Sequence, residues 1–399
     1  MKKTQILIAG AGPVGATAAY RLAKAGLDVL LVEALPSCPQ DMRASTMHPP
    51  TLDMMASLGV FEELDALGLR APVYHYRNRK SGAVVEFDLS ELDDVCAYPF
   101  RLQCEQYKLT RLLTEKLEKE KPGSILFSHR VLCYEQDADG VTVKVETPLA
   151  IETIRADYLI AADGANSTIR KWTGTEFEGF TYPERFLTLS TDYPIEKHLG
   201  DMASVNYVAD SEEWFVLLRV PEFWRVLVPT DPAATDEELL SDANKDDVFR
   251  RLLGTDVKVE TEHRTLYRVH QRVAKSFRDR RVLLVGDAAH LNNPLGGFGM
   301  NSGIHDIWNL SDKLLSIYND NADPDTVLDL FARQRRAVAK SFVQTQTIAN
   351  KEMMEAANGS GKTEQEIKLQ DIAGNPDERR SYLWKQAMYN SLEEEAAVT

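Results

Sequence analysis

A glycine-rich turn near the N-terminus constrains the fold of this chain more than any other feature. Residues 5–9 form a short apolar run, which predicts a strand buried on both faces, as in a parallel sheet. The run leads into Gly-Ala-Gly-Pro-Val-Gly at residues 10–15, and the alanine-rich segment 16–25 that follows predicts a helix. A second buried strand at residues 29–32 ends at Glu33. The spacing therefore predicts a βαβ unit.

The residue types in this unit fit an adenine dinucleotide. Gly10 makes a tight turn, Gly12 lets a pyrophosphate approach the backbone, and Gly15 lets the helix pack on the strand. Pro13 belongs to the same turn, where the helix N-terminus offers free N–H groups to phosphates. The Glu33 carboxylate is placed to accept the hydroxyls of the adenosine ribose. The unit alone does not distinguish NAD from FAD.

A second strand and turn occur in the middle of the chain. Residues 157–162 are mostly apolar and predict a strand, and Asp163-Gly164 is a turn pair. Ser167 is placed to cap the helix that starts next. Without other context, this segment is one more strand–helix connection.

A third strand leads into a glycine-rich loop. Residues 281–285 predict a buried strand that ends at Gly286-Asp287, and residues 293–301 form a loop that contains three glycines, at positions 296, 297 and 299. A helical run from about residue 302 to 317 follows. A glycine loop that opens a helix is an anion or dipole site. If a flavin lay over this loop, the loop would stabilise negative charge on the reduced ring, and Asp287 would bond ribityl hydroxyls.

Composition excludes several classes of function. The chain has 399 residues, with 46 Lys and Arg against 61 Asp and Glu, and its net charge of -15 argues against nucleic acid as a partner. The four cysteines show no CxxC pair or metal-ligand spacing, which favours free thiols in a reducing compartment and no metal site. No stretch approaches the ~18–20 apolar residues that span a bilayer. We expect a cytoplasmic protein without stable membrane insertion.

Two other segments have a different residue pattern. Residues 73–99 and 182–270 are rich in short β-type runs, and they predict an antiparallel sheet inserted into the α/β fold. Residues 236–253 are acidic and polar and predict a surface helix. The strands of this sheet are expected at residues 204–208, 213–219 and 224–229.

Taken together, the motifs resemble those of the class A flavoprotein monooxygenases, the para-hydroxybenzoate hydroxylase family. The glycine motif with Glu33, the Asp-Gly segment and the later Gly-Asp-Ala-Ala-His with its proline and glycines occur in that family's order, over about residues 4–350. The resemblance implies an α/β, Rossmann-like FAD-binding fold with an inserted substrate sheet. Its domains would be a discontinuous FAD-binding domain (1–72, 100–181 and 271–350), a substrate domain (73–99 and 182–270) and a C-terminal helical tail (351–399).

The resemblance also implies roles for individual residues. Asp163, with Arg170, would serve a motif shared by FAD and the nicotinamide, and Pro294 would lie near the flavin where oxygen reacts. The residues implied to hold FAD are Gly10, Gly12, Pro13, Gly15, Glu33, Arg43, Gln106, Val131, Asp163, Arg225, Asp287, Gly299, Met300 and Asn301.

The substrate residues are less sharply indicated. Tyr207 matches a substrate-contacting tyrosine and Arg219 lies near a position that binds a carboxylate, although sheet packing or surface charge is the alternative for both. His48 is a candidate acid or base beside the flavin, and a structural role before the following helix is the alternative. Further candidates for the pocket wall are Tyr76, Tyr98 and Arg101.

The implied function is an FAD-dependent aromatic hydroxylase. NADH or NADPH would reduce FAD, and a flavin C4a-hydroperoxide would hydroxylate a phenolic or hydroxypyridine-type ring. The expected partners are O2 and a small aromatic molecule. A homodimer is one expected assembly. The alternatives are a flavin-dependent halogenase or reductase of the same fold, or a non-catalytic FAD-binding redox protein. Residues 53–69 contain no lysine, which argues against a halogenase, and the loop 294–301 argues against a simple binder.

Overall fold

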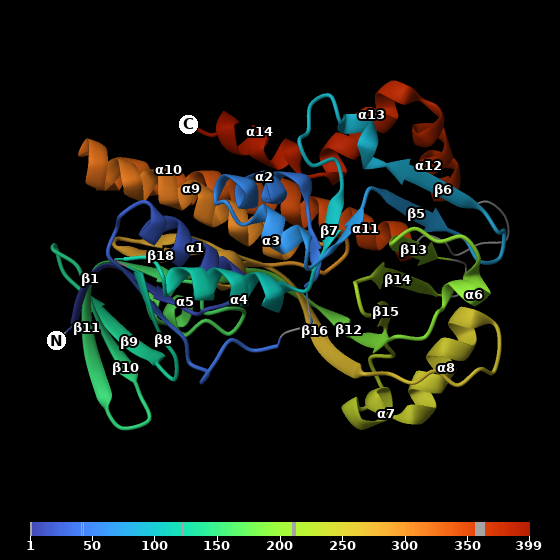
Figure 1. The fold of residues 1–399 in the computed structure, drawn as a ribbon, viewed down its shortest axis with the longest axis horizontal. Helices are drawn as coiled ribbons and strands as arrows, with labels where there is room; N and C mark the ends of the chain where they lie inside the picture. The colour runs from blue at the N-terminus through green and yellow to red at the C-terminus, as the bar shows by residue number, and fades with distance from the viewer. Residues whose placement is uncertain (1, 41, 43, 122, 210–212, 356–363) are drawn as a thin grey trace.

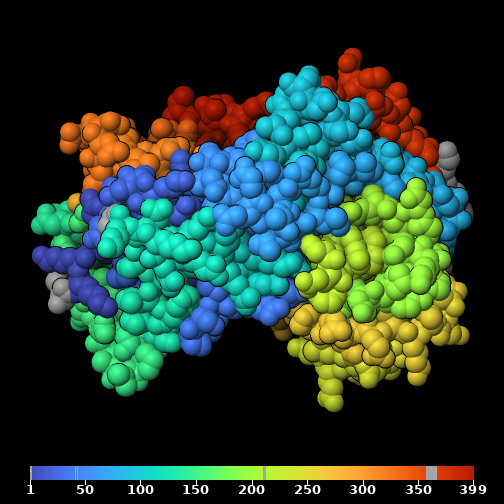
Figure 2. All heavy atoms as spheres, viewed as in Figure 1, coloured from blue at the N-terminus to red at the C-terminus, as the bar shows by residue number. Residues whose placement is uncertain are grey.

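The computed structural model describes residues 2–40, 42, 44–121, 123–209, 213–355 and 364–399. Two large sheets form its framework, and a small three-stranded sheet lies beside them. Figure 1 shows the first large sheet near the N-terminus and the second at the opposite end, and Figure 2 shows the same two ends in space-filling form. Among the described residues, no helix is long and apolar enough to cross a membrane.

The first sheet carries the predicted βαβ unit. Its central strands are parallel in the order β18-β11-β1-β2-β8, while β17 pairs antiparallel with β18, and β9 and β10 form an antiparallel extension of β11. The strands are β1 (Lys2–Ala9), β2 (Val29–Val32), β8 (Gly123–Leu126), β9 (Arg130–Gln136), β10 (Val141–Glu146), β11 (Ile151–Ala161), β17 (Arg278–Asp279) and β18 (Val282–Leu284).

The second sheet has the order β19-β16-β12-β15-β14-β13-β5-β6. Its strands are β5 (Val73–Arg77), β6 (Val84–Asp88), β12 (Phe177–Thr191), β13 (Val205–Ala209), β14 (Trp214–Arg219), β15 (Trp224–Pro229), β16 (His263–Ala274) and β19 (His290–Leu291). The antiparallel prediction holds for every pair but one, since β13 and β5 run parallel. The small sheet joins β3 (Thr46–Met47), β7 (Arg101–Gln103) and β4 (Leu69–Ala71).

Helices α1, α9 and α10 lie along one face of the first sheet, and α7 and α8 cover the far end of the second (Figure 1). The helices are α1 (Pro13–Lys24), α2 (Pro49–Ser57), α3 (Phe61–Asp65), α4 (Gln106–Leu117), α5 (Thr168–Thr173), α6 (Glu196–Leu199), α7 (Asp236–Leu240), α8 (Asp242–Leu253), α9 (Phe298–Asp320), α10 (Pro324–Val338), α11 (Thr345–Glu355), α12 (Glu364–Gly374), α13 (Pro376–Gln386) and α14 (Tyr389–Ala397). Short helical segments are η1 (Leu89–Leu92), η2 (Gly286–Ala288) and the π-helical η3 (Ala339–Gln344).

Burial explains why the apolar runs form the central strands. Ile6, Leu7 and Ile8 of β1 are completely buried, as a strand covered on both faces requires. The predicted surface helix at 236–253 is instead two helices, because Ser241 takes an extended conformation and caps the second one with its side chain. Phe249 of that second helix is also fully buried, so one of its faces packs on the second sheet rather than facing solvent.

The described part of the C-terminal tail is helical, as expected, and its acidic end contacts α10. Glu395 accepts a hydrogen bond from Arg335, which is completely buried in α10. Arg335 also donates through Nε to Asp306 of α9 at 2.7 Å. A buried guanidinium needs carboxylate partners, so the end of the chain is part of the ion-pair network beneath the first sheet's turns.

A buried histidine in α9 predicts loss of stability in acid. Burial lowers the pKa of His305 to about 3, and the charge of Arg335 adds to the effect. Because the unfolded chain accepts this proton below about pH 6.5 and the folded chain does not, this group removes about 1.4 kcal/mol of unfolding free energy per pH unit as the pH falls from about 6.5 towards 3.

We expect His305→Gln to reduce that acid dependence. Unfolding free energies from urea titrations at several pH values measure it, with His198→Gln in exposed α6 as the control. Parallel curves for His305→Gln and the natural protein would contradict the assignment.

Candidate functional site

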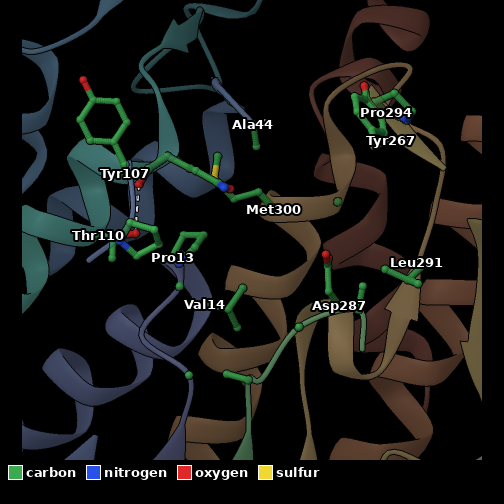
Figure 3. A pocket seen from close by; sticks show the side chains of 18 of the residues that line it. Pro13, Val14, Ala44, Tyr107, Thr110, Tyr267, Asp287, Leu291, Pro294 and Met300 are labelled. Atoms are coloured by element: carbon green, nitrogen blue, oxygen red, sulfur yellow. Dashed lines mark hydrogen bonds between the residues drawn. The ribbon is translucent and has the colours of Figure 1, made fainter. Parts of the chain in front are cut away.

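A single cavity of about 630 Å³ is lined by turns of the first sheet and by strands of the second. Figure 3 shows side chains from α1, α4, α9 and the segment after β18 around it. Of the predicted residues, those that line it are Gly10, Gly12, Pro13, Glu33, Gln106, Val131, Asp163, Tyr207, Arg225, Asp287, Pro294, Gly299 and Met300. Segments distant in sequence therefore meet at one elongated site.

Glu33 stabilises the turn at one end of the cavity. Its two carboxylate oxygens accept hydrogen bonds from the N–H of Ala11 at 2.7 Å and the N–H of Leu35 at 2.9 Å. Each oxygen keeps a second lone pair, so the carboxylate can still accept hydroxyl groups of a ligand. Val131 of β9 lines the same cavity.

The glycines of the motif have different structural reasons. Gly10 has a φ of +98°, and a Cβ at Gly15 would lie 1.9 Å from the Gly10 carbonyl oxygen, so both are required by the protein's own packing. A Cβ at Gly12 would meet no protein atom within 4 Å. Gly12 is therefore not required for folding, and the space above it, at the N-terminus of α1, is open to a phosphate.

Arg170 joins the two later turns in the middle of the site. Its guanidinium donates to the carbonyl of Ala288 at 3.0 Å and to the carbonyl of Ala165 at 2.7 Å. Burial raises the pKa of Asp163, whose carboxylate accepts from the N–H of Ile169 at 3.2 Å. These contacts fix the turn after β11 against the turn that carries Asp287.

The glycine-rich loop forms the wall before α9. Gly297 caps that helix with a φ of +71°, and Gly296 has a φ of +102°. Asn301 does not line the cavity: its buried side chain donates to the carbonyls of Thr46 at 2.9 Å and Gly297 at 2.7 Å. Asn301 therefore fixes the loop, while the first N–H groups of α9 lack partners within the helix.

Asp306 supports the Asp287 turn from below. One carboxylate oxygen accepts from the N–H of Gly286 at 2.9 Å and from His290 Nε2 at 2.8 Å, and the other accepts from Arg335. Burial alone would raise the pKa of Asp306, but His290 and Arg335 outweigh it and lower the pKa. His290 thus has a structural contact beside the site, to Asp306.

The structure places His48 in a structural position rather than at the cavity wall. It is completely buried, its Nε2 donates to the Gly296 carbonyl at 2.7 Å, and its backbone N–H donates to Asn301 Oδ1 at 2.9 Å. Burial, with the nearby charge of Arg101, holds the pKa of His48 well below its usual range. A neutral histidine that precedes α2 and anchors the glycine loop fits the helix-leading alternative.

Of the three candidates from the second sheet, Tyr207 and Arg225 line the cavity and Arg219 does not. Tyr207 lines the cavity, and Arg225 lines it too and donates to Ser45 Oγ at 3.1 Å. Arg219, at the end of β14, is not a lining residue, and its guanidinium lies 5.6 Å from the centre of the Trp224 ring. Arg43 lies outside the described residues.

The sequence interpretation did not anticipate part of the wall. Tyr267 and His270 come from β16, and Thr188 comes from β12. The β-type pattern of these segments predicts strands, but one sequence does not tell which residues of a strand meet a cavity. Arg101 also lines the cavity, whereas Tyr76 and Tyr98 do not.

Comparison with known proteins identifies the family. A family model described as an FAD binding domain matches residues 3–346. The chain is 32% identical to a para-nitrophenol 4-monooxygenase of a Pseudomonas species over 350 residues, which is 86% of each protein. It is also 32% identical to a 6-hydroxy-3-succinoylpyridine 3-monooxygenase of Pseudomonas putida, over 96% of this chain and 97% of the relative.

The chain belongs to the class A flavoprotein monooxygenases. A solved p-nitrophenol 4-monooxygenase from Pseudomonas putida superposes with a TM-score of 0.91 at 28% identity, covering 97% of this chain and 99% of that one. An aklavinone-11 hydroxylase solved with FAD and aklavinone gives a TM-score of 0.78 at 25% identity, covering 89% of this chain and 69% of that one.

The cavity of this monooxygenase fits FAD. It joins the Glu33 carboxylate, an open glycine at a helix N-terminus and a second glycine loop at the start of α9. The chemistry of these elements suits the ribose, the pyrophosphate and the flavin ring in turn, so Glu33, Gly12 and the loop before α9 would hold those parts of FAD.

Two glycine variants test the pyrophosphate site. Gly12→Ala should fold normally, because the added Cβ meets no protein atom within 4 Å. It should bind FAD at least about tenfold more weakly, because that Cβ occupies space needed by the pyrophosphate. Gly15→Ala should also lose thermal stability, because its Cβ overlaps the Gly10 carbonyl. FAD titration and thermal unfolding of the apoproteins measure both effects, and normal FAD binding by Gly12→Ala would contradict the placement.

Asp287→Ala tests the ribityl assignment. Loss of a carboxylate acceptor should weaken FAD binding by about tenfold to a hundredfold, so the purified variant should carry much less flavin. Asp320→Ala, in the exposed last turn of α9, is the matched control and should retain a full complement. Full FAD occupancy and normal activity in Asp287→Ala would rule out the assigned role.

Proposed function

We propose that this monooxygenase hydroxylates a small phenolic or hydroxypyridine-type ring with O2 and NADH or NADPH. The observation that supports it most directly is that the cavity at the cofactor turns continues to a wall formed by the second sheet and β7. We call this part the second chamber, and it is lined by Tyr207, Val216, Leu218, Leu227, Arg225 and Arg101. The relatives named above act on p-nitrophenol and on 6-hydroxy-3-succinoylpyridine, and both compounds carry a hydroxyl group on an aromatic ring. Bound FAD, once reduced, supplies the activated oxygen that the ring accepts.

The chain's own residues would bind, orient and enclose the reactants. Gly12, Glu33 and Asp287 would hold the dinucleotide, and the loop before α9 would face the flavin ring. Pro294 would lie at the side where oxygen reacts. The four cysteines are free, which is consistent with action in the cytoplasm. The homodimer stays a prediction.

The second chamber is suited to excluding water. Val216, Leu218 and Leu227 contribute apolar wall from β14 and β15, and the Tyr207 ring stacks on Tyr76 with centroids 4.9 Å apart. Excluding water protects the activated oxygen from wasteful release as hydrogen peroxide. The Tyr207 hydroxyl accepts from Arg101 at 3.4 Å, so its own proton is available to a substrate oxygen.

Purified holoenzyme tests this function directly. We expect a yellow protein whose NADH or NADPH oxidation is stimulated at least about tenfold by one member of a panel of phenols and hydroxypyridines, with a hydroxylated product. Halide-dependent product would favour the halogenase alternative, and oxidation that no aromatic compound stimulates would favour a reductase. A colourless protein that FAD does not reconstitute would contradict the proposal.

A further inference from the structure

Arg101 is an unusual feature of the second chamber. It is the first residue of β7, it is only 1% exposed, and it lines the cavity wall together with Tyr207. An arginine is charged at every ordinary pH, and a buried charge is costly unless an opposite charge or several hydrogen bonds accompany it.

The protein supplies little of that compensation. None of the carboxylates in the described part of the chain forms an ion pair with Arg101, and its Nε has no hydrogen-bond partner there. The contacts that it does make are a long hydrogen bond to the Tyr207 hydroxyl at 3.4 Å and a position 4.3 Å from the centre of the Tyr74 ring. Both are weaker than a carboxylate contact.

The other groups that face Arg101 do not neutralise it. Tyr74 and Tyr76 come from β5, Tyr207 comes from β13, and His48 precedes α2. Burial raises the pKa of Tyr74 well above its ordinary value, and burial holds the pKa of His48 well below its own, so both are neutral at pH 7. Among the lining residues, the carboxylates are Glu33, Asp163 and Asp287, which belong to the cofactor's part of the cavity.

We propose that Arg101 binds the ionised hydroxyl oxygen of the substrate, so that the aromatic compound is held as its phenolate. This inference rests on the proposed function, because it names the residue that binds the hydroxyl group of that substrate. The phenol gives its proton to the solvent buffer, the resulting oxyanion accepts N–H bonds from the guanidinium, and the buried charge is compensated. Arg101 thereby selects compounds whose aromatic hydroxyl group ionises easily, and the resulting phenolate ring is electron-rich before oxygen transfer.

Binding of 4-nitrophenol to the oxidised holoenzyme, without NADH or NADPH, tests the proposal. Difference absorbance spectra across pH report the fraction bound as the yellow phenolate. We expect the bound compound to ionise at lower pH than it does in free solution, and binding below that free value to release up to about one proton per site into a weakly buffered indicator solution. Failure to bind, or ionisation at or above the free value, would overturn the proposal.

Substitutions then assign the effect to Arg101. Arg101→Gln should weaken 4-nitrophenol binding by about tenfold to a hundredfold and return its ionisation to a pH at or above the free value. Binding of 4-nitroanisole, which has no ionisable oxygen, should change by less than about threefold. Arg70→Gln, a mostly exposed arginine on the neighbouring strand β4, should behave as the natural protein does.

Two further controls keep the outcome decisive. If Arg101→Gln does not retain FAD, Arg101→Lys keeps the charge and should preserve the lowered ionisation, and loss of that effect in a folded, yellow Arg101→Lys protein would count against a charge role. An equal loss of 4-nitrophenol and 4-nitroanisole binding in Arg101→Gln would overturn the proposal in favour of general packing. Because these measurements need no turnover, their failure is distinct from failure of aromatic-stimulated NADH or NADPH oxidation.

Discussion

The parallel pairing of β1, β11 and β18 is the constraint on which the rest of the structure depends. Their registers, Ala9 with Ala161 and Ala161 with Leu284, bring three chain turns to the same edge of the sheet. Carboxyl ends of parallel strands share an edge, so Gly10, Asp163 and Asp287 meet there although more than 270 residues separate the first from the last. The buried apolar strands make this register costly to shift, because a slip would expose the core.

The site is therefore supported from beneath as well as formed at its surface. Asp306 connects Gly286 to His290 and Arg335, and Arg335 reaches Glu395 near the chain's end. Removing any one partner would leave a buried charge without compensation. The C-terminal helices consequently contribute to the geometry of the cofactor turn without lining the cavity.

Sequence patterns predicted the strands and turns that line the cofactor half of the cavity, because each turn there has a local physical requirement. Gly10 needs a positive φ, Gly15 needs close packing, and both can be recognised within one βαβ unit. The second chamber depends on which faces of distant strands meet, which local patterns do not encode. Arg219 was expected near the substrate and lies instead by Trp224, while Arg101, a minor candidate, lines the cavity. His48 illustrates the same limit, since only burial in the folded chain shows that its ring anchors the Gly296 loop.

The two halves also differ in their electrostatics. The cofactor half places carboxylates and helix N-termini around the turns, whereas the second chamber combines apolar side chains, tyrosines and the buried guanidinium groups of Arg101 and Arg225. Under the proposed role of Arg101, this division would let a chain with net charge -15 attract an anionic aromatic molecule locally.

The central claim is that one cavity joins an FAD site to a second chamber that binds an aromatic anion. A crystal structure of the holoenzyme with 4-nitrophenol tests this claim most directly. The account predicts the adenosine ribose at Glu33, the flavin ring at the loop that precedes α9, and the phenolate oxygen within hydrogen-bond distance of the Arg101 guanidinium. A flavin ring outside this cavity, or a phenol bound with its oxygen away from Arg101, would contradict it.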